Sequence, residues 1–537
     1  DKHPLSDLIS EEEIEAAMDS MKSKANSSSG LSPFVLRKLY SSLLPFILLI
    51  FNNAIRTCHF PISFLESCVF FLHKKGSKLD PNNYRSIALE NPFLKLLTSI
   101  FTARISNFAE ENNLLPTWQF GFRKGRSTTS AATLLCEIIK SRLSSKKRTF
   151  VCFIDFTKCF DTIRRDLLFI KLQTIGIPFE LCKLLDYIFK NFTFVIRSGK
   201  YLTEKFMTHI GLPQGDPLSP ILFILFVHDI ANCFPHLGPL FHGLYISYIM
   251  YADDLCIIAE SAEELQAAIN CLQNYCLENG LKINTSKSKC MVFYRGRPPT
   301  CSFDLNGTTL ELVNNFNYLG FHLTTQLSFS SHLTNTTTKA NSRCGTLMSK
   351  LPLRDLPLDI VIRVYECYVL PLFRYGLPLW LSSVSTTAKD SANSSFTKFL
   401  KSYLGVPFYV NNAITHFITN TCPLISRLEV LLPSCLGSFT FPPELTGYQL
   451  SILQHPLPTE PYNAIPLIPS FFWRSQIFET LPTSAFHRKT LCKILYDLDH
   501  NTFCGKEYFH IDIEQCTCIA CGDPVNHYHR YFCACYM

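Results

Sequence analysis

The stretch that most constrains this chain is residues 249–258, which place the adjacent Asp253 and Asp254 between two apolar, β-prone runs. Such runs are typical of strands, and a short polar pair between them predicts a hairpin with carboxylates at its tip. Carboxylates enclosed by so much apolar sequence need partners, because an unpaired buried charge is costly. Taken alone, the pair is more often an acidic turn than a site.

Composition indicates a globular chain with several packed subdomains, since 537 residues are 47% hydrophobic and 17% charged. The longest apolar runs, residues 43–51 and 221–227, are well short of the ~20 residues of a membrane helix. No secretion signal is recognisable, so we expect an intracellular protein without a membrane segment. The 23 cysteines are mostly single and apolar in context, which predicts core thiols in a reducing compartment.

Local patterns predict where helices begin and end. Ser10, with Glu13 three residues later, has the pattern of a capping box. Gly280 is a good helix stop. Apolar periodicity predicts helices over residues 33–58, from about 86 to 108, over 262–278 and through most of 330–410. Residues 411–500 are rich in proline and aromatic residues, and their pattern assigns no organisation.

A second carboxylate, Asp155, ends the apolar strand predicted over residues 150–156. Ligands commonly bind at the carboxyl ends of buried strands. If Asp155 and Asp253 converge, they can hold two divalent ions that clamp the attacking and leaving oxygens of a phosphoryl transfer. Oxygen ligands suit Mg²⁺.

Between these strands lies a rigid loop, residues 211–220, with the sequence GLPQGDPLSP. Two glycines and three prolines in ten residues restrict its backbone, and a helix is predicted to begin near Leu218. Gln214 can both donate to and accept from a ligand. Three basic clusters, at residues 73–76, 119–127 and 146–148, either follow a phosphate backbone or form solvated turns.

Together these segments resemble the palm of a reverse transcriptase. The matching stretches are residues 153–161 (FIDFTKCFD), 211–220 and 251–254 (YADD). The chain is most similar to the reverse transcriptases of non-LTR (LINE-type) retrotransposons, through HKKG at 73–76, NYRSIAL at 83–89, QFGFR at 119–123, GLKIN at 280–284 and YLG at 318–320. The resemblance extends to about residue 410 through thumb-like segments at 369–380 and 404–407.

The resemblance implies an α+β right-hand polymerase with fingers, palm and thumb, followed by a small C-terminal Cys/His zinc segment. The implied parts are an N-terminal helical extension (1–64), fingers and palm (65–325), thumb and post-thumb (326–410), a poorly defined linker (411–515) and a CCHC-like zinc segment (516–537).

Carried over residue by residue, the resemblance makes Asp155 and Asp253 the catalytic pair that binds two Mg²⁺ ions, with Mn²⁺ as the alternative. Asp254 completes the catalytic motif as the less certain ligand. Lys287 falls where the family has a lysine near the leaving pyrophosphate and would act as general acid. Lys289 is close enough in sequence to take that role instead.

The resemblance also implies a nucleotide pocket. Lys75 and Arg85 would hold the triphosphate, with Lys74 as the alternative to Lys75. Gln214 and Gly215 would shape the pocket around the nucleotide. Phe160 falls where the family has an aromatic steric gate against the 2′-hydroxyl, whereas the plainer interpretation is a core phenylalanine.

The C-terminal residues 516–537 hold five of the 23 cysteines and two histidines. This density favours a Zn²⁺ site over chance thiols, and it resembles the CCHC segment that follows the thumb in the family. A tetrahedral Cys₃His site would use Cys518, Cys521, His529 and Cys533, with His527 as an alternative to His529, and Cys516 or Cys535 as alternatives to another ligand.

The implied function is RNA-directed DNA synthesis, with an RNA template, a DNA primer or target and dNTPs as partners. Priming would occur at a nicked target, in the nucleus during integration, with RNA–protein assembly in the cytoplasm. One alternative is a group II intron-like or domesticated reverse transcriptase. The other is a catalytically weak, retroelement-derived nucleic-acid-binding protein. The sequence gives no indication of an oligomeric state.

Overall fold

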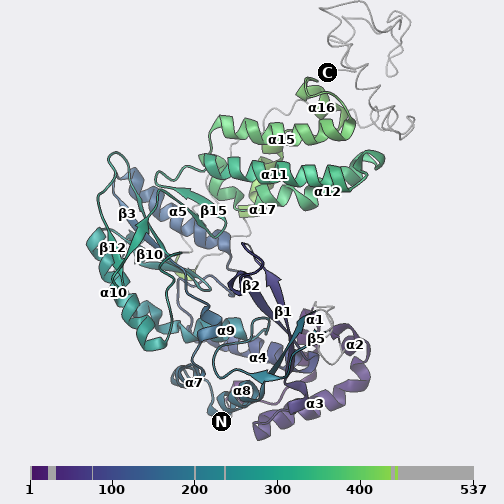
Figure 1. Ribbon diagram of the computed structural model, residues 1–537, viewed down its shortest axis with the longest axis vertical. Helices are drawn as coiled ribbons and strands as arrows, with labels where there is room; N and C mark the ends of the chain where they lie inside the picture. Colours follow the sequence, from purple (N-terminus) through teal and green to yellow (C-terminus); the bar gives the residue numbers. More distant parts are fainter. Residues whose placement is uncertain are drawn as a thin grey trace, which may run out of the picture. The chain divides into compact units, whose positions relative to one another are not determined.

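The computed structural model describes residues 3–21, 32–74, 76–198, 201–234, 238–436 and 442–445. The chain divides into two compact units (Figure 1). Unit 1 comprises residues 1–320, 324–327 and 440–445, and unit 2 comprises residues 321–323, 328–439 and 446–537.

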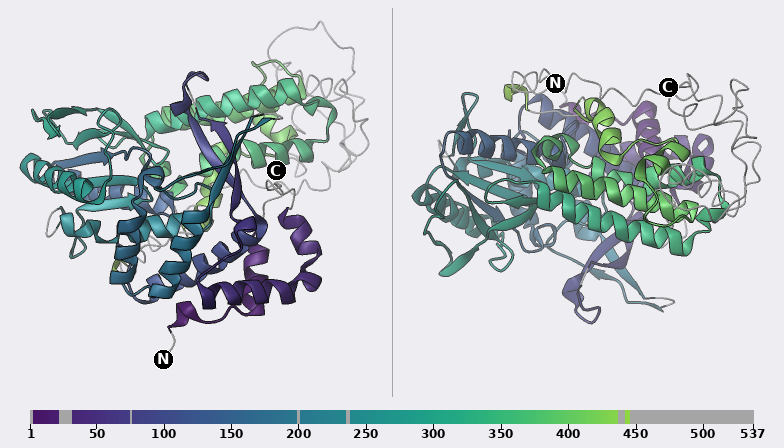
Figure 2. Two further views of the ribbon diagram at one scale, coloured as in Figure 1. Left: turned by 60° about the horizontal axis from the view of Figure 1, so that its bottom comes forward. Right: turned by 90° about the horizontal axis from the view of Figure 1, so that it is seen from above.

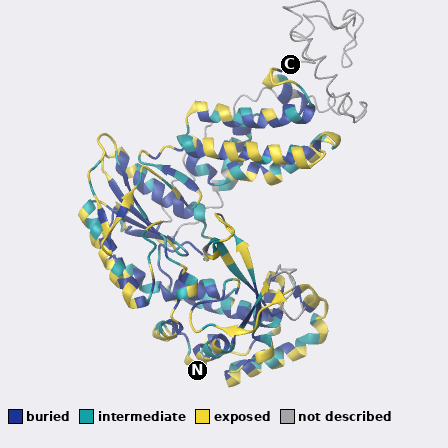
Figure 3. Cartoon of the chain, in the orientation of Figure 1, coloured by how far each residue is buried: buried dark blue, intermediate teal, exposed yellow. Residues whose placement is uncertain are grey.

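The core of unit 1 is a six-stranded sheet in the order β12-β13-β11-β3-β10-β9. Its strands are β3 (Thr149–Ile154), β9 (Tyr248–Tyr251), β10 (Asp254–Ala259), β11 (Lys289–Phe293), β12 (Phe303–Leu305) and β13 (Thr308–Leu312). Helices α5 (Thr128–Ser144) and α10 (Ala262–Asn279) pack on this sheet. The central strands are therefore mostly dark in Figure 3, where buried residues are blue.

A second sheet in unit 1 has the order β2-β1-β4-β5, with β6 paired to β4. Its strands are β1 (Glu66–His73), β2 (Tyr84–Glu90), β4 (Thr193–Ser198), β5 (Tyr201–Leu202) and β6 (Phe206–Met207). Figure 2 shows β1 and β2 as a long purple-blue hairpin. Two small pairs complete the strands: β7 (Leu240–Phe241) with β8 (Leu244–Tyr245), and β14 (Asn315–Tyr318) with β15 (Phe321–Thr324).

Strand β2 corrects the prediction of a helix from about residue 86. Seven residues of β2 pair in antiparallel register with β1, and this ladder outweighs local helix propensity. Helix α4 (Pro92–Glu111) begins only after the strand, where the Asn91 side chain accepts a hydrogen bond from the Phe93 N–H at 3.0 Å. The predicted helix is therefore correct from Pro92 onward and wrong before it.

The other α-helices of unit 1 are α1 (Glu11–Ser20), α2 (Pro33–Lys38), α3 (Tyr40–Thr57), α6 (Cys159–Thr162), α7 (Arg165–Thr174), α8 (Phe179–Asn191) and α9 (Ser219–Phe226). The predicted helix over 33–58 is confirmed, with a break at Leu39. Gly280 ends α10 in the left-handed conformation, as predicted.

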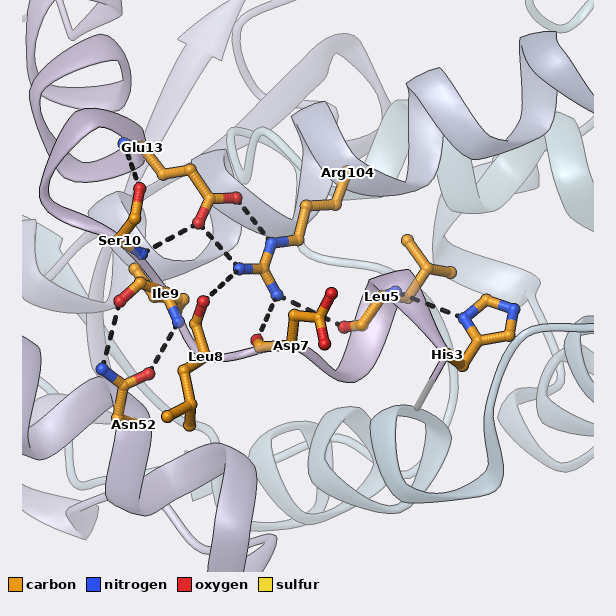
Figure 4. A network of polar contacts seen from close by, with 9 residues as sticks. All are labelled: His3, Leu5, Asp7, Leu8, Ile9, Ser10, Glu13, Asn52 and Arg104. Carbon is orange, nitrogen blue, oxygen red and sulfur yellow. Dashed lines mark hydrogen bonds and ion pairs between the residues drawn. The ribbon is translucent and has the colours of Figure 1, made fainter. Parts of the chain in front are cut away.

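Within unit 1, one arginine of α4 holds the N-terminal segment in place (Figure 4). Arg104 forms a bidentate ion pair with Glu13 at 2.6 and 2.7 Å, and it also donates to the carbonyl of Asp7 at 2.7 Å. The predicted capping box is confirmed, since Glu13 also accepts from the Ser10 N–H. Burial opposes ionisation of Glu13, but the bonds from Arg104 and Ser10 outweigh it and lower the pKa of this carboxyl.

Unit 2 is helical, which confirms the prediction for residues 330–410. Its helices are α11 (Ser330–Lys350), α12 (Leu358–Tyr368), α13 (Leu370–Arg374), α14 (Leu377–Trp380), α15 (Thr386–Leu404), α16 (Asn412–Ile418) and α17 (Leu424–Leu436). Helix α11 packs on α15, and Tyr365 contacts Phe396 and Phe399 at ring-centroid distances of 4.6 and 5.2 Å. In the part of the chain that the structure describes, no helix combines the length and apolarity needed to cross a bilayer.

Candidate active site

The end of β3 positions Asp155. All six residues of the strand are buried, so the strand is fixed on both faces. The Asp155 N–H donates to the Ser288 hydroxyl at 3.1 Å, and the Asp155 carbonyl accepts from the Asn284 N–H at 2.8 Å. The Asp155 side chain is half-buried, and the two hydrogen bonds hold its backbone on both sides.

The turn between β9 and β10 positions Asp253, and the predicted hairpin is confirmed. Tyr251 pairs with Asp254 across the hairpin, which leaves Ala252 and Asp253 as the two turn residues. Ala252 has φ +58°, the left-handed conformation that two-residue hairpins require and that non-glycine residues rarely adopt. Asp253 lies half-buried at the tip.

Strand pairing brings the two carboxylate-bearing segments together. β10 pairs antiparallel with β3, with Leu255 opposite Ile154, so Asp254 lies next to Asp155. Partial removal from solvent, with repulsion from Asp253 and Asp155, raises the pKa of Asp254 to about 6. Asp254 is exposed at the start of β10, and a bound cation would reverse the repulsion between the three carboxylates.

Two further side chains contact Asp155 or Asp253. The Cys159 thiol donates to Asp253 Oδ2 at 3.3 Å. Burial and the Asp253 charge raise the pKa of this thiol, which keeps it a neutral donor. Lys287 Nζ lies 3.5 Å from Asp155 Oδ2. Lys289 is instead engaged by Glu311 at 2.8 Å, so Lys287 is the lysine that faces the carboxylates.

A buried glutamine clamps the hairpin turn. Gln119 is fully buried, and its Oε1 accepts from the N–H groups of Ala252 and Gly121, both at 2.8 Å. Its Nε2 donates to the Ala252 carbonyl at 3.2 Å. The clamp thus satisfies both backbone groups of the left-handed residue. The left-handed conformation itself costs roughly 1–2 kcal/mol. The clamp avoids a further cost of about 1–3 kcal/mol for each buried backbone group that would otherwise lack a partner.

The segment that carries Gln119 runs alongside β9. The Phe120 N–H donates to the Met250 carbonyl at 2.7 Å, and the Met250 N–H donates to the Trp118 carbonyl at 2.9 Å. A Cβ on Gly121 would lie 2.2 Å from the Ala252 nitrogen, so only glycine permits this approach. Turn and segment are therefore packed backbone to backbone.

The Gly-Pro loop lies against the segment that follows β3. The Leu212 N–H donates to the Phe160 carbonyl at 2.7 Å, and Gln214 Nε2 donates to Asp161 Oδ1 at 3.0 Å. The Phe160 ring is half-buried and stacks on Phe223 of α9 at a centroid distance of 4.8 Å. The structure thus brings Phe160, the predicted gate residue, into contact with the predicted pocket loop. Phe160 belongs to the segment that follows Asp155 in the sequence.

Gly215 fits the loop onto β2. Its φ is +119°, and a Cβ would lie 2.7 Å from the Ala88 carbonyl oxygen. The Ala88 N–H donates to the Gln214 carbonyl at 2.8 Å. Glycine is therefore required both by the backbone angle and by the close approach to the strand.

The predicted triphosphate ligands lie on the β1–β2 hairpin. Arg85 is exposed on β2 opposite Leu72. Lys74 is exposed just after β1, and its N–H donates to the Asn83 carbonyl at 2.8 Å. Since residues 72 and 74 share a face by strand alternation, Lys74 and Arg85 lie on one face. Lys75 lies outside the described residues.

The second basic cluster serves the fold. Arg123 binds Glu110 at 2.8 and 2.5 Å. Arg126 donates to the carbonyls of Thr117 and Gln119 at 2.5 and 3.0 Å, and burial lowers its pKa to about 10. The sequence left open whether this cluster contacts phosphates or forms a solvated turn. Arg123 and Arg126 fit neither description, because both bind groups of the protein itself. Both brace the segment that clamps the hairpin.

Comparison with known proteins agrees with this geometry. Residues 72–323 match the family described as reverse transcriptase (RNA-dependent DNA polymerase). The chain contains a reverse transcriptase domain. The matched range includes β2 to β14 and parts of β1 and β15, together with all the candidate site residues described above.

The relatives of this reverse transcriptase domain confirm the predicted resemblance to the enzymes of non-LTR retrotransposons. The chain is 26% identical over 427 residues to the probable RNA-directed DNA polymerase from transposon BS of Drosophila melanogaster, covering 77% of this chain and 46% of that protein. It is 25% identical over 413 residues to the RNA-directed DNA polymerase from mobile element jockey of Drosophila funebris, covering 75% and 45%. The chain thus spans less than half the length of these relatives.

Among solved structures, apo telomerase from Candida tropicalis is similar with a TM-score of 0.36 and 11% identity, covering 72% of this chain and 67% of that one. A score this low supports no residue-by-residue comparison.

The carboxylates of the reverse transcriptase domain fit Mg²⁺. Within the described residues, no group of three or more His, Cys, Asp or Glu side chains forms a metal cluster. A pair of carboxylates such as Asp155 and Asp253 is what Mg²⁺ ordinarily takes from a protein, since its other ligands are waters and substrate phosphates. Burial is the larger cause of the raised pKa of Asp254, and repulsion from Asp253 and Asp155 adds to it; a bound cation would neutralise that repulsion.

The predicted Zn²⁺ ligands Cys518, Cys521, His529 and Cys533 lie outside the described residues, so the structure does not bear on them.

No role is predicted from sequence for Gln119 or Cys159, although both contact the turn that carries Asp253. Gln119 stands in a basic, aromatic stretch that suggested nucleic-acid contact. Its polar side chain between apolar neighbours, two residues before Gly121, was the available signal. Pairing with β9 is long-range, so the sequence could not assign it.

We expect Gln119→Leu to slow primer extension by the reverse transcriptase domain about 10- to 100-fold, as for other supports of metal-binding groups. Leucine leaves the Ala252 N–H and carbonyl unsatisfied, so the turn that carries Asp253 loses its position. The fall should lie in kcat, with little change in the KM for dNTP, and half-maximal activity should need more Mg²⁺. Steady-state kinetics over a Mg²⁺ titration measures all three.

The matched control is Arg104→Met, which removes the hydrogen bonds to the N-terminal segment in Figure 4 and lowers stability without touching the turn. An unchanged kcat in Gln119→Leu would contradict the clamp. An equal fall in kcat in both variants at equal loss of thermal stability would also contradict it.

Proposed function

We propose that this chain is the polymerase part of a non-LTR retrotransposon protein. In this role it extends a primer 3′-hydroxyl with dNTPs on an RNA template and releases pyrophosphate. The supporting observation is the β3–β10–β9 pairing that brings Asp155 and the Asp253 turn together. The relatives named as RNA-directed DNA polymerases support the same activity.

In this proposal Asp155 and Asp253 hold the two Mg²⁺ ions, with Mn²⁺ as a substitute. When bound, the metal lowers the pKa of the primer hydroxyl and neutralises charge that develops on the phosphates. Asp254 adds negative charge beside the pair. Lys287, 3.5 Å from Asp155 Oδ2, is placed to donate a proton to the leaving pyrophosphate.

The nucleotide is held by residues from three elements. Arg85, together with Lys74 or Lys75, binds the triphosphate from the β1–β2 hairpin, because guanidinium groups bind phosphate oxygens in pairs. Gln214 and Gly215 form the wall that lies against β2. Phe160 faces the sugar as the gate, and its stacking on Phe223 keeps the ring from yielding to a 2′-hydroxyl.

The partners are an RNA template and a DNA primer. We further propose that the primer is a nicked target site, so that synthesis occurs in the nucleus during integration and follows RNA–protein assembly in the cytoplasm. The net charge of +7 agrees with a polyanionic partner.

The main test of the proposal is primer extension on an RNA template with Mg²⁺. We expect Asp253→Ala to abolish extension while RNA–primer binding persists, since the carboxylate serves the metal and not the duplex. Asp304→Ala, which removes an exposed carboxylate from β12 of the same sheet, is the control and should extend normally. Equal extension by Asp253→Ala and the unmodified chain would refute this active site.

The gate assignment makes a separate prediction. Phe160→Ala should raise the incorporation of ribonucleotides relative to deoxyribonucleotides on the order of 10- to 100-fold, the range expected for steric discrimination in a pocket. The measurement is the ratio of kcat/KM for a matched rNTP and dNTP. If Phe160 is only a core residue, both values fall together and the ratio stays constant.

We also propose that Cys518, Cys521, His529 and Cys533 bind one Zn²⁺ ion. Elemental analysis should find about one zinc per chain and much less in Cys521→Ser, because structural zinc needs all four ligands. Cys271→Ser changes an exposed thiol on α10 and should keep its zinc. A metal-free unmodified chain would rule the site out.

A further inference from the structure

Where the loop of residues 211–220 meets β2, the fold buries two carboxyl side chains whose charges act on each other. The loop lies alongside β2: the Ala88 N–H donates to the Gln214 carbonyl, and Gly215 packs against Ala88. Glu90, at the end of β2, is two residues after Ala88, and Asp216 is two residues after Gln214. They are 7% and 5% exposed. Buried carboxyl groups are rare unless they are paired or neutral.

Glu90 is surrounded as a neutral acid would be. Within the described residues, neither of its carboxyl oxygens has a hydrogen-bond partner. The hydroxyl of Ser67, which is opposite Glu90 in the β1–β2 register, is also buried and without a partner there. A carboxylate ion in this position would have no donor to replace its hydration.

Asp216 has the opposite surroundings. Its Oδ1 accepts from the Leu218 N–H at 3.0 Å, and the nearby Thr98 hydroxyl, which donates to the Lys95 carbonyl at 3.2 Å, also favours the ionised form. The ionised form is therefore supported by donors. Burial still raises the pKa of Asp216 to about 6. Burial, then repulsion from Asp216, raises the pKa of Glu90 well above its usual range.

The charge of one lysine acts on both carboxyls, although the described residues show no ion pair between that lysine and either of them. Lys95 of α4 lowers the pKa of Glu90 and of Asp216 by its charge. Two carboxylates beside one ammonium would leave one buried negative charge uncompensated, which is strongly unfavourable. One proton restores neutrality. The proton belongs to the pair, with Glu90 as its main site because Asp216 has the donors.

We infer that Glu90 and Asp216 hold one proton between them and act as positioning residues that keep the Gln214 loop on β2. The role in nucleotide binding rests on the function proposed above, whereas the proton on the pair does not. The Gln214–Asp161 bond and the close fit of Gly215 to Ala88 depend on the loop lying against this strand. Glu90 lies at the end of β2 and Asp216 lies in the same loop, so the charge on the two carboxyls acts on this contact.

The sign of the pH dependence follows from the raised pKa values. The unfolded chain releases the Glu90 proton near its ordinary pKa of 4.5, whereas the folded chain retains it to much higher pH. The folded state thus binds more protons than the unfolded state above that value, and its stability falls as pH rises. Ionisation of both carboxyls also places like charges on β2 and on the loop, which drives them apart.

The test compares Glu90→Gln with the unmodified full chain from about pH 5 to about pH 9 by thermal melting. Glutamine keeps the shape and stays neutral. We expect equal melting temperatures near pH 5 and an advantage for Glu90→Gln of at least about 2 °C near pH 9. Asp216→Asn, which keeps an acceptor for the Leu218 N–H, should flatten the pH dependence as well, because it removes the repulsion on Glu90.

Glu66→Gln is the matched control. Glu66 lies at the start of β1 and pairs with Lys205 at 2.5 Å in a partly exposed ion pair. Its replacement should not produce a pH-dependent gain. A constant difference between Glu90→Gln and the unmodified chain at every pH would overturn the inference, as would an unchanged pH dependence in Asp216→Asn. If Glu90→Gln does not fold, Asp216→Asn still decides.

Kinetics tests the positioning role. The KM for dATP, whose base does not titrate in this range, should rise on the order of 10-fold toward pH 9 in the unmodified chain. The KM should stay nearly constant in Glu90→Gln. Dividing the KM of the unmodified chain by that of Glu90→Gln at each pH removes any pH effect that both proteins share. Parallel KM profiles would overturn the positioning role. Absence of extension at every pH would refute the proposed function instead, and the melting profiles would still decide whether the pair holds a proton.

Discussion

The antiparallel pairing of β10 with β3 is the interaction on which the active site depends. Asp155 and the Asp253 turn are far apart in the chain, and neither strand holds its carboxylate near the other without the ladder from Leu255 to Ala259. The ladder is buried on both strands, so a slip by one residue would expose apolar side chains. Packing of the core therefore fixes the distance between charges that would otherwise separate. Burial first, and then repulsion from Asp253 and Asp155, raises the pKa of Asp254 at this point of the sheet.

A second constraint acts on the turn itself. The left-handed Ala252 is unfavourable in isolation, and its N–H and carbonyl point away from the strand ladder. Gln119 meets both groups, and Gly121 lets its segment approach closely enough to do so. Arg123 and Arg126 brace that segment through Glu110 and the carbonyls of Thr117 and Gln119. A stretch that resembles a nucleic-acid contact in composition thus supports a catalytic turn.

The sequence predicted the parts of the site that short-range rules govern. The β9–β10 hairpin, the strand before Asp155 and the capping box at Ser10 each depend on neighbouring residues, and all are confirmed. Strand β2 was missed because its partner β1 outweighs local helix propensity. The choice between Lys287 and Lys289 stayed open, because it depends on Glu311, a residue from another strand. Long-range pairing is what one sequence leaves undetermined.

The buried polar residues of this domain differ in the hydrogen-bond donors that surround them. Gln119 is fully bonded and neutral, so it stabilises the turn at every pH. Asp216 has donors and tends to ionise, whereas Glu90, two residues beyond the point where β2 meets the loop, has none and tends to keep its proton. The catalytic turn and the nucleotide loop are therefore attached to the fold by different means. The turn depends on amide hydrogen bonds that do not titrate, and the loop depends in part on a proton. Alkaline conditions should consequently weaken nucleotide binding before they disturb the position of Asp253.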